Sequence, residues 1–154
     1  MFPSTVERVP SQTDQAINER IRRQTEKNVS RYVNSDGVAI QERLDQLDRE
    51  WDIERLLEAN AATACLAGLT LGATVDRKWF LFPAVVAGFL LQHALQGWCP
   101  PLPVFRRLGY RTASEIDYER YALKAIRGDF DHLTTRTAGS DSGKASQAIQ
   151  AAMA

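Results

Sequence analysis

The sequence predicts an all-α integral membrane protein, in which a two-helix transmembrane hairpin is flanked by cytoplasmic amphipathic helices. Two long apolar stretches, 56–75 and 79–98, carry a single charge between them, on Glu58. Each is about 20 residues long, so as a helix it matches a hydrocarbon core of roughly 30 Å. Three residues, 76–78, separate the two stretches. That connection is long enough for a tight turn alone, so the two helices are expected to be antiparallel.

The segments before the hairpin are expected to lie in the cytoplasm. Residues 1–12 contain Pro3 and Pro10 and are predicted to form a flexible leader. Residues 13–55 are predicted to form a helical region, because apolar side chains recur there every three or four residues. Packing of this region on itself, on lipid or on a partner is left open, since its basic stripe suits both water and anionic headgroups: Arg20, Arg23, Lys27 and Arg31.

The segment after the hairpin, residues 100–132, is also expected in the cytoplasm. Thr112 and Glu115 have the spacing of a capping box, in which each side chain bonds the backbone N–H of the other residue. This pair predicts a helix over 112–127. The small and polar residues of 133–154 predict a disordered tail.

Aromatic and basic residues near the ends of the two spans indicate where the interfaces lie and which side faces the cytoplasm. Five such residues are predicted interface anchors: Trp51, Trp79, Trp98, Arg106 and Arg107. Arginines cluster on the terminal side of the hairpin, whereas the turn carries Arg77 and Lys78. The positive-inside rule then places both termini in the cytoplasm, as for a multi-pass protein of the bacterial inner (plasma) membrane.

A ladder of small and amide side chains at four-residue spacing marks each span. Folding the chain at 76–78 pairs the two ladders and predicts close helix packing, with Gly68 opposite Gly88. The polar members of the ladders would then satisfy one another near the cytoplasmic ends. The predicted packing residues are Asn60, Ala64, Gly68 and Gly72 on the first span and Ala84, Gly88, Gln92 and Gln96 on the second.

Three residues of the spans carry candidate chemistry. Glu58 and His93 are ionisable and are expected at similar depth, so a proton relay between them is one hypothesis. The other is that both are structural polar residues close to the interface. Cys99 follows the second span and is a candidate reactive thiol. A helix C-terminus disfavours the thiolate, so the alternative for Cys99 is a small apolar helix end.

Composition and motifs argue against several function classes. Lys plus Arg and Asp plus Glu both number 19, and a net charge of zero argues against a nucleic-acid binder. Two cysteines are too few for a structural zinc site or a disulfide framework, and no metal is expected. The chain lacks the common nucleotide-binding, zinc-protease and hydrolase motifs, so no catalytic residue and no cofactor are predicted.

Two stretches of the sequence match a known pattern. LDREWDIER precedes the first span, and GFLLQHALQGWCPPLPVFRRLGYRT closes the second, with Cys99 and Pro100 followed by Leu108 and Gly109. Over residues 48–112 the chain resembles the YgaP-like transmembrane domain, a small bacterial inner-membrane hairpin whose second helix ends in a Cys-Pro motif. The resemblance implies two membrane helices and no established molecular function. Some members of that family are fused to a rhodanese, a sulfur-transfer domain.

The expected function is that of a non-catalytic membrane anchor or scaffold protein. Two helices alone bury little surface, so besides the lipid bilayer the expected partners are a second copy or another membrane protein. One alternative is a thiol- or sulfur-handling membrane protein that uses Cys99 with a partner in trans. A further alternative is an oligomeric ion or proton conductor, with Glu58, His93 and Gln92 lining the path.

Overall fold

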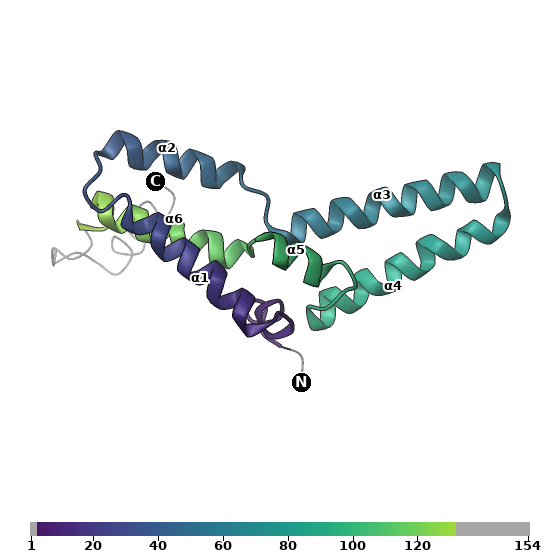
Figure 1. Cartoon of the computed structure of the whole chain (residues 1–154). Helices are drawn as coiled ribbons and strands as arrows, with labels where there is room; N and C mark the ends of the chain where they lie inside the picture. The colour runs from purple at the N-terminus through teal and green to yellow at the C-terminus, as the bar shows by residue number, and fades with distance from the viewer. Residues whose placement is uncertain (1–2, 132–154) are drawn as a thin grey trace, which may run out of the picture. The chain divides into compact units, whose positions relative to one another are not determined.

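The computed structural model describes residues 3–131, which form helices and connecting turns without any strand. The all-α prediction is confirmed for this part of the chain, and the predicted disordered tail, 133–154, lies outside it. In chain order the helices are η1 (Pro10–Gln12), α1 (Gln15–Ser30), α2 (Gly37–Arg49), α3 (Ile53–Thr74), η2 (Arg77–Phe80), α4 (Leu81–Gln96), α5 (Leu102–Leu108) and α6 (Ala113–Arg127) (Figure 1).

The chain divides into two compact units. Of the described residues, 3–24 and 51–116 form the first unit, and 25–50 and 117–131 form the second. The boundaries fall inside α1, between α2 and α3, and inside α6. The predicted helical region 13–55 is therefore not one structural unit, because its ends belong to the first unit and its middle to the second.

Aspartate side chains begin the helices on either side of the short break between α2 and α3. Asp36 accepts a hydrogen bond of 2.9 Å from the backbone N–H of Ala39, and Asp52 accepts one of 2.7 Å from that of Arg55. Such N-caps satisfy backbone donors that a helix leaves free at its start. Because Asp52 starts a new helix, α2 does not continue into α3.

The predicted flexible leader is wrong for its second half, which packs into the core of the first unit. Val9 is 1% exposed and belongs to a cluster with Ile53, Leu57 and Leu102. The Thr13 hydroxyl donates a 2.8 Å hydrogen bond to the carbonyl oxygen of Val9. A buried valine and a satisfied carbonyl hold this segment in place.

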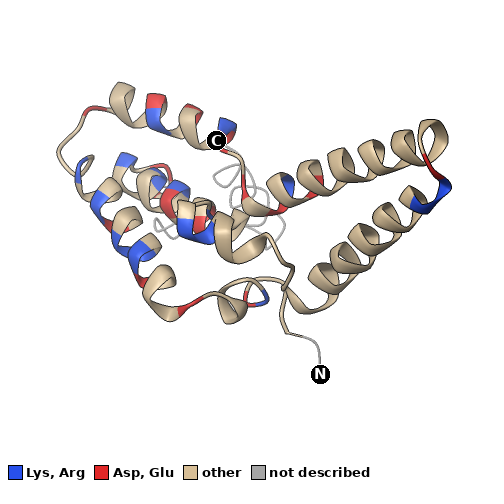
Figure 2. Cartoon of the chain, turned by 45° about the vertical axis from the view of Figure 1, so that its right-hand side comes forward, with Lys and Arg blue, Asp and Glu red and all other residues tan. Residues whose placement is uncertain are grey.

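Helices α3 and α4 lie side by side and run antiparallel, joined through η2 (Figure 1). They lie within two stretches, Gly37–Thr74 and Arg77–Gln96, that are by length and composition apolar enough to cross a membrane. The length of α3 is about 33 Å, and η2 with α4 extends over about 32 Å. Figure 2 shows Lys, Arg, Asp and Glu at the two ends of this helix pair and none along its middle.

The contact between α3 and α4 uses a different face of α4 from the predicted one. A Cβ atom on Gly68 would lie 2.7 Å from Cδ of Pro83, and one on Gly72 would lie 2.7 Å from the ring of Phe80. Gly88, the predicted partner of Gly68, has nothing within 4 Å of its Cβ position. The predicted pairing of the two ladders is therefore wrong.

The turn between the helices explains this difference. Asp76 accepts a 2.8 Å hydrogen bond from the backbone N–H of Lys78 and so starts η2 directly after α3. The contact of Gly72 with Phe80 places the midpoint of the hairpin at residue 76, whereas the predicted pair Gly68 and Gly88 has its midpoint at residue 78. This displaces α4 along α3 by about one helical turn. Of the other ladder residues, Asn60, Ala84 and Gln96 are exposed, and Ala64 and Gln92 are half-buried.

A fully buried arginine joins three segments of the first unit. Arg106 forms a bidentate ion pair with Glu115, at 2.7 and 2.8 Å, and donates to Asn18 Oδ1 at 2.8 Å. It also donates to Thr13 Oγ1 and to the carbonyl oxygen of Tyr110. Arg106 is 0% exposed, so its prediction as a membrane-interface anchor is wrong.

The capping box at the start of α6 makes the partner of this arginine rigid. The Glu115 carboxylate accepts a 2.8 Å hydrogen bond from the Thr112 N–H, and the Thr112 hydroxyl accepts one of 3.2 Å from the Glu115 N–H. Burial raises the pKa of Glu115, but the hydrogen bonds from Arg106 and Thr112 and the arginine charge outweigh it. The net pKa of this carboxyl lies below its usual value of 4.5.

The second unit has its own core, in which a buried carboxylate is neutralised. Ile40, Leu44 and Leu47 of α2 and Leu123 of α6 are nearly inaccessible to water. Glu119 is 0% exposed, and its carboxylate accepts hydrogen bonds from Arg43 at 2.8 Å and from Asn28 at 3.3 Å. A buried charge with such partners holds the helices of this unit in one register.

Candidate functional site

The candidate site lies where the start of α3 meets the end of α4. His93 is 2% exposed, and its Nε2 atom lies 2.8 Å from Oε2 of Glu54. Glu54 belongs to the first turn of α3, directly after the Asp52 cap. His93 occupies the last turn of α4. A histidine that pairs with a carboxylate through one nitrogen has its ring orientation and proton position fixed by that bond.

Arg8 holds the other side of the Glu54 carboxylate. Its guanidinium lies 3.0 Å from Oε1 of Glu54 and donates a 3.0 Å hydrogen bond to the carbonyl oxygen of Ala94. The Ala94 carbonyl is one of those that the end of α4 leaves without a helical partner. Arg8 therefore both fixes the carboxylate and caps α4.

Gly97 allows this close approach. It has φ of +81° and ends α4, and a Cβ atom there would lie 2.1 Å from the carbonyl oxygen of Arg8. A side chain at this position would meet both a left-handed backbone conformation and a backbone atom. Glycine at position 97 thus allows the backbone of Arg8 to lie close against the end of α4.

Cys99 completes the cluster. It is 5% exposed and packs with Val9, Ile53 and Leu57. Its thiol interacts with the imidazole of His93. Nδ1 of His93 is buried and has no hydrogen-bond partner of good geometry in the described part of the chain. With Nε2 directed at Glu54, Nδ1 is the nitrogen left to exchange a proton with the thiol.

An apolar groove of about 500 Å³ adjoins this cluster. Its walls come from α3, from α4 and from the segment that follows α4, and Cys99 forms part of the wall together with Pro100 and Pro101. Leu57 and Ala61 line it on α3, and the opposite wall is aromatic and aliphatic. The volume lies in the range of small-molecule sites.

The hypothesis of a proton relay between Glu58 and His93 named the wrong carboxylate. Glu58 is exposed, and the partner of His93 is Glu54, one helical turn earlier. The same displacement of α4 that removed the ladder pairing accounts for this change. The sequence did not point to Glu54, because this residue lies before the first apolar stretch, or to Arg8, because nothing in the leader marks that residue.

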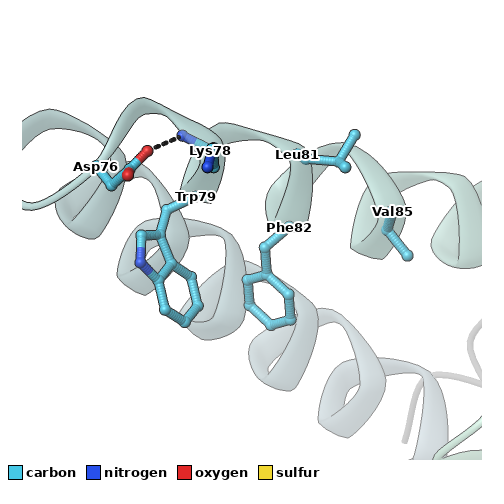
Figure 3. A pocket seen from close by; sticks show the side chains of 6 residues that line it. All are labelled: Asp76, Lys78, Trp79, Leu81, Phe82 and Val85. Atoms are coloured by element: carbon cyan, nitrogen blue, oxygen red, sulfur yellow. Dashed lines mark hydrogen bonds between the residues drawn. The ribbon is translucent and has the colours of Figure 1, made fainter.

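A second hollow of about 460 Å³ lies at the turn between the two helices (Figure 3). The rings of Trp79 and Phe82 meet edge to face, with centroids 6.4 Å apart.

The other predicted interface anchors differ in exposure. Trp79 is 43% exposed and Trp51 is 42% exposed. The guanidinium of Arg55 lies 4.5 Å from the ring centroid of Trp51. Trp98 is half-buried against Phe89. Arg107, unlike Arg106, is exposed.

Comparison with known proteins provides no family assignment. No protein-family model matches the chain. No curated protein and no solved structure matches it either. Among residues 3–131, no group of three or more His, Cys, Asp or Glu side chains is arranged to hold a metal ion. The interpretation of the site therefore depends on its own geometry.

Proposed function

We propose that the protein is a small integral protein of the bacterial inner membrane, in which α3 and the η2–α4 segment cross the bilayer as a hairpin with both termini cytoplasmic. The observation that supports this most directly is the outward direction of their apolar side chains. Of the most apolar window of Arg77–Gln96, 6% is buried. Exposure of such surface to water costs about 25 cal/mol per Å², a cost that lipid removes. The large exposed side chains include Leu66, Leu69, Leu81, Val85, Phe89, Leu91 and Leu95.

The exposed hydroxyls of α3 are also compatible with lipid. Thr63, Thr70 and Thr74 each donate a hydrogen bond of 2.7 or 2.8 Å to the backbone carbonyl four residues earlier. A hydroxyl paired within its own helix needs no water, which is the condition for a polar group in the bilayer core.

Within this membrane protein we propose a non-catalytic anchor or scaffold role, with the second unit as the part that contacts a partner. Aromatic and aliphatic side chains stand out from that unit: Val38 is 68%, Tyr118 64% and Tyr121 46% exposed. Surface tyrosines are common anchors of protein interfaces. We also propose that residues 48–112 belong with the YgaP-like transmembrane domains, on the basis of the Cys-Pro and Leu-Gly pairs.

Cysteine labelling in intact cells tests the topology. In a Cys65→Ser, Cys99→Ser background, Lys78→Cys places a thiol in the turn, and Val38→Cys places one in the second unit. A membrane-impermeant maleimide is expected to label Lys78→Cys in intact spheroplasts and Val38→Cys after lysis alone. Equal labelling of the two variants before lysis would refute the hairpin. Crosslinking in native membranes, followed by identification of co-purifying proteins, tests the scaffold role.

A second candidate function is thiol chemistry at Cys99, with a partner in trans. One specific observation favours it: His93 and Glu54 lie beside the thiol in the order that activates a nucleophile, base and then orienting carboxylate. Cys65 provides the matched control, because the neighbour of its thiol is not an imidazole but the carbonyl oxygen of Pro83, at 3.8 Å. Iodoacetamide should modify Cys99 faster than Cys65, and His93→Gln should remove the difference.

A further inference from the structure

Three features of the first unit meet at Cys99. The thiol forms part of the wall of an apolar groove and interacts with the imidazole of His93. Nδ1 of that imidazole has no hydrogen bond of good geometry, and Glu54 binds Nε2 on the other side of the ring. His93 is 2% exposed, so its unsatisfied nitrogen lowers the stability of the fold. Such a group in a native structure calls for an explanation, and a catalytic role is one. The groove shows what kind of molecule could reach the same sulfur.

We propose that Cys99 accepts the acyl group of a long-chain acyl thioester, with the hydrocarbon chain lying in the groove between α3 and α4. This inference rests on the thiol candidate of the proposed function and names its substrate class. The described site then acts as a carrier or transfer point for an acyl group at the membrane.

The lining of the groove favours a hydrocarbon over a small sulfur anion. Leu57, Ala61, Phe89 and Leu90 are apolar, and Asn60 is the one side chain in the wall with an amide. The wall contains no Lys or Arg. An anion would have to lose its water there without gaining a cation, whereas a chain of methylene groups loses none of its favourable contacts.

The length of the groove along the helices also suits a chain. Its lining extends on α4 from Phe82, near the turn, to Leu90, and on α3 from Ala64 to Leu57. On an α-helix the eight steps from residue 82 to residue 90 cover about 12 Å. A chain with its carbonyl carbon at Cys99 would follow this path from the end of α4 toward the turn at Asp76.

The reaction is a thioester exchange that needs no oxidant or reductant. The Sγ–H proton of Cys99 passes to Nδ1 of His93 as Sγ attacks the carbonyl carbon of the donor. The carbon–sulfur bond of the donor then breaks, and the departing thiolate takes the proton from Nδ1. The products are a thioester on Cys99 and a free thiol. Throughout, Glu54 accepts the Nε2–H and keeps the ring in one orientation.

The test uses the full-length protein in detergent micelles, with alkyne-tagged palmitoyl-coenzyme A as the donor. Label that neutral hydroxylamine removes is expected on the parent protein and on Cys65→Ser, and it should be absent from Cys99→Ser. His93→Gln retains a polar side chain of similar size and should slow labelling by about 100-fold. Label that remains on Cys99→Ser would overturn the proposal.

A variant of the groove tests the site of the acyl chain independently of the thiol. Ala64→Phe fills the groove away from Cys99, so it should lower palmitoyl transfer at least tenfold while acetyl transfer from acetyl-coenzyme A persists. Equal loss of both, or of neither, would refute the groove as the chain site. Should Cys99 react with iodoacetamide in a His93-dependent manner but take no acyl group, the acyl inference fails and the thiol function stands. If it shows neither reaction, both fail.

Discussion

Replacement of Arg106 by methionine tests how the first unit is held together. Methionine keeps the length and most of the volume of the arginine stem but removes every donor. Arg106 is fully buried, and its five hydrogen bonds reach residues on the leader side, on α1 and at the start of α6. The variant therefore removes the arginine donor from Glu115, Asn18, Thr13 and the carbonyl oxygen of Tyr110.

The magnitude follows from the exposure of the two charged partners. Removal of one partner from a buried ion pair costs about 3–5 kcal/mol. The Glu115 side chain keeps 23% of its exposure, so water recovers part of this, and the lower end, about 3 kcal/mol, applies. For a chain of this size each kcal/mol lowers the Tm by roughly 2–4 °C. The expected decrease is roughly 6–12 °C.

Thermal unfolding in a mild detergent, followed by circular dichroism, measures this effect. Arg107→Met is the matched control, because Arg107 is adjacent but exposed, and its Tm should change little. A double variant, Arg106→Met with Glu115→Leu, should recover much of the loss, since it removes both charges rather than one. Equal melting of Arg106→Met and Arg107→Met would refute the ion pair as a source of stability.

Three further predictions use the same assay or a simple extension of it. The pKa of Glu115 lies below 4.5 in the folded chain, so its contribution to stability is complete above that pH and is lost as the pH falls through the folded value; Glu115→Gln should flatten this acid-side decrease in Tm. Gly97→Ala should destabilise the protein by at least about 1 kcal/mol through its positive φ, and more through the contact with Arg8, whereas Gly88→Ala should be neutral or better. Gly68→Leu should separate α3 from α4, detected as loss of a crosslink between them, and Gly88→Leu should not; the opposite result would restore the predicted ladder.

Local signals in the sequence predicted local structure well. The Thr112 and Glu115 spacing describes a capping box that forms with both of its hydrogen bonds. Two long apolar stretches correspond to helices that are long and apolar enough to span a membrane. These features depend on residues within one or two turns of each other, which periodicity and capping rules describe directly.

Features that depend on distant parts of the chain could not be predicted in this way. Val9 lies in a proline-containing segment whose apolar residues show no helical periodicity, yet it enters the core. Arg106 finds Asn18 at a separation of 88 residues. His93 pairs with Glu54 rather than Glu58 because η2 starts directly after α3 and displaces α4 by one turn. A ladder of small residues is compatible with either register, so spacing alone could not choose between them.

Extraction of membranes at alkaline pH tests the central claim, that α3 and α4 are embedded in lipid. Cells expressing the full chain are lysed without detergent, the membranes are washed with sodium carbonate, and the fractions are separated by ultracentrifugation. If α3 and α4 are embedded in lipid, the protein stays in the membrane pellet and is released by detergent alone. Recovery of the intact chain in the carbonate supernatant would contradict it, because a surface-bound or soluble helix pair is released under these conditions.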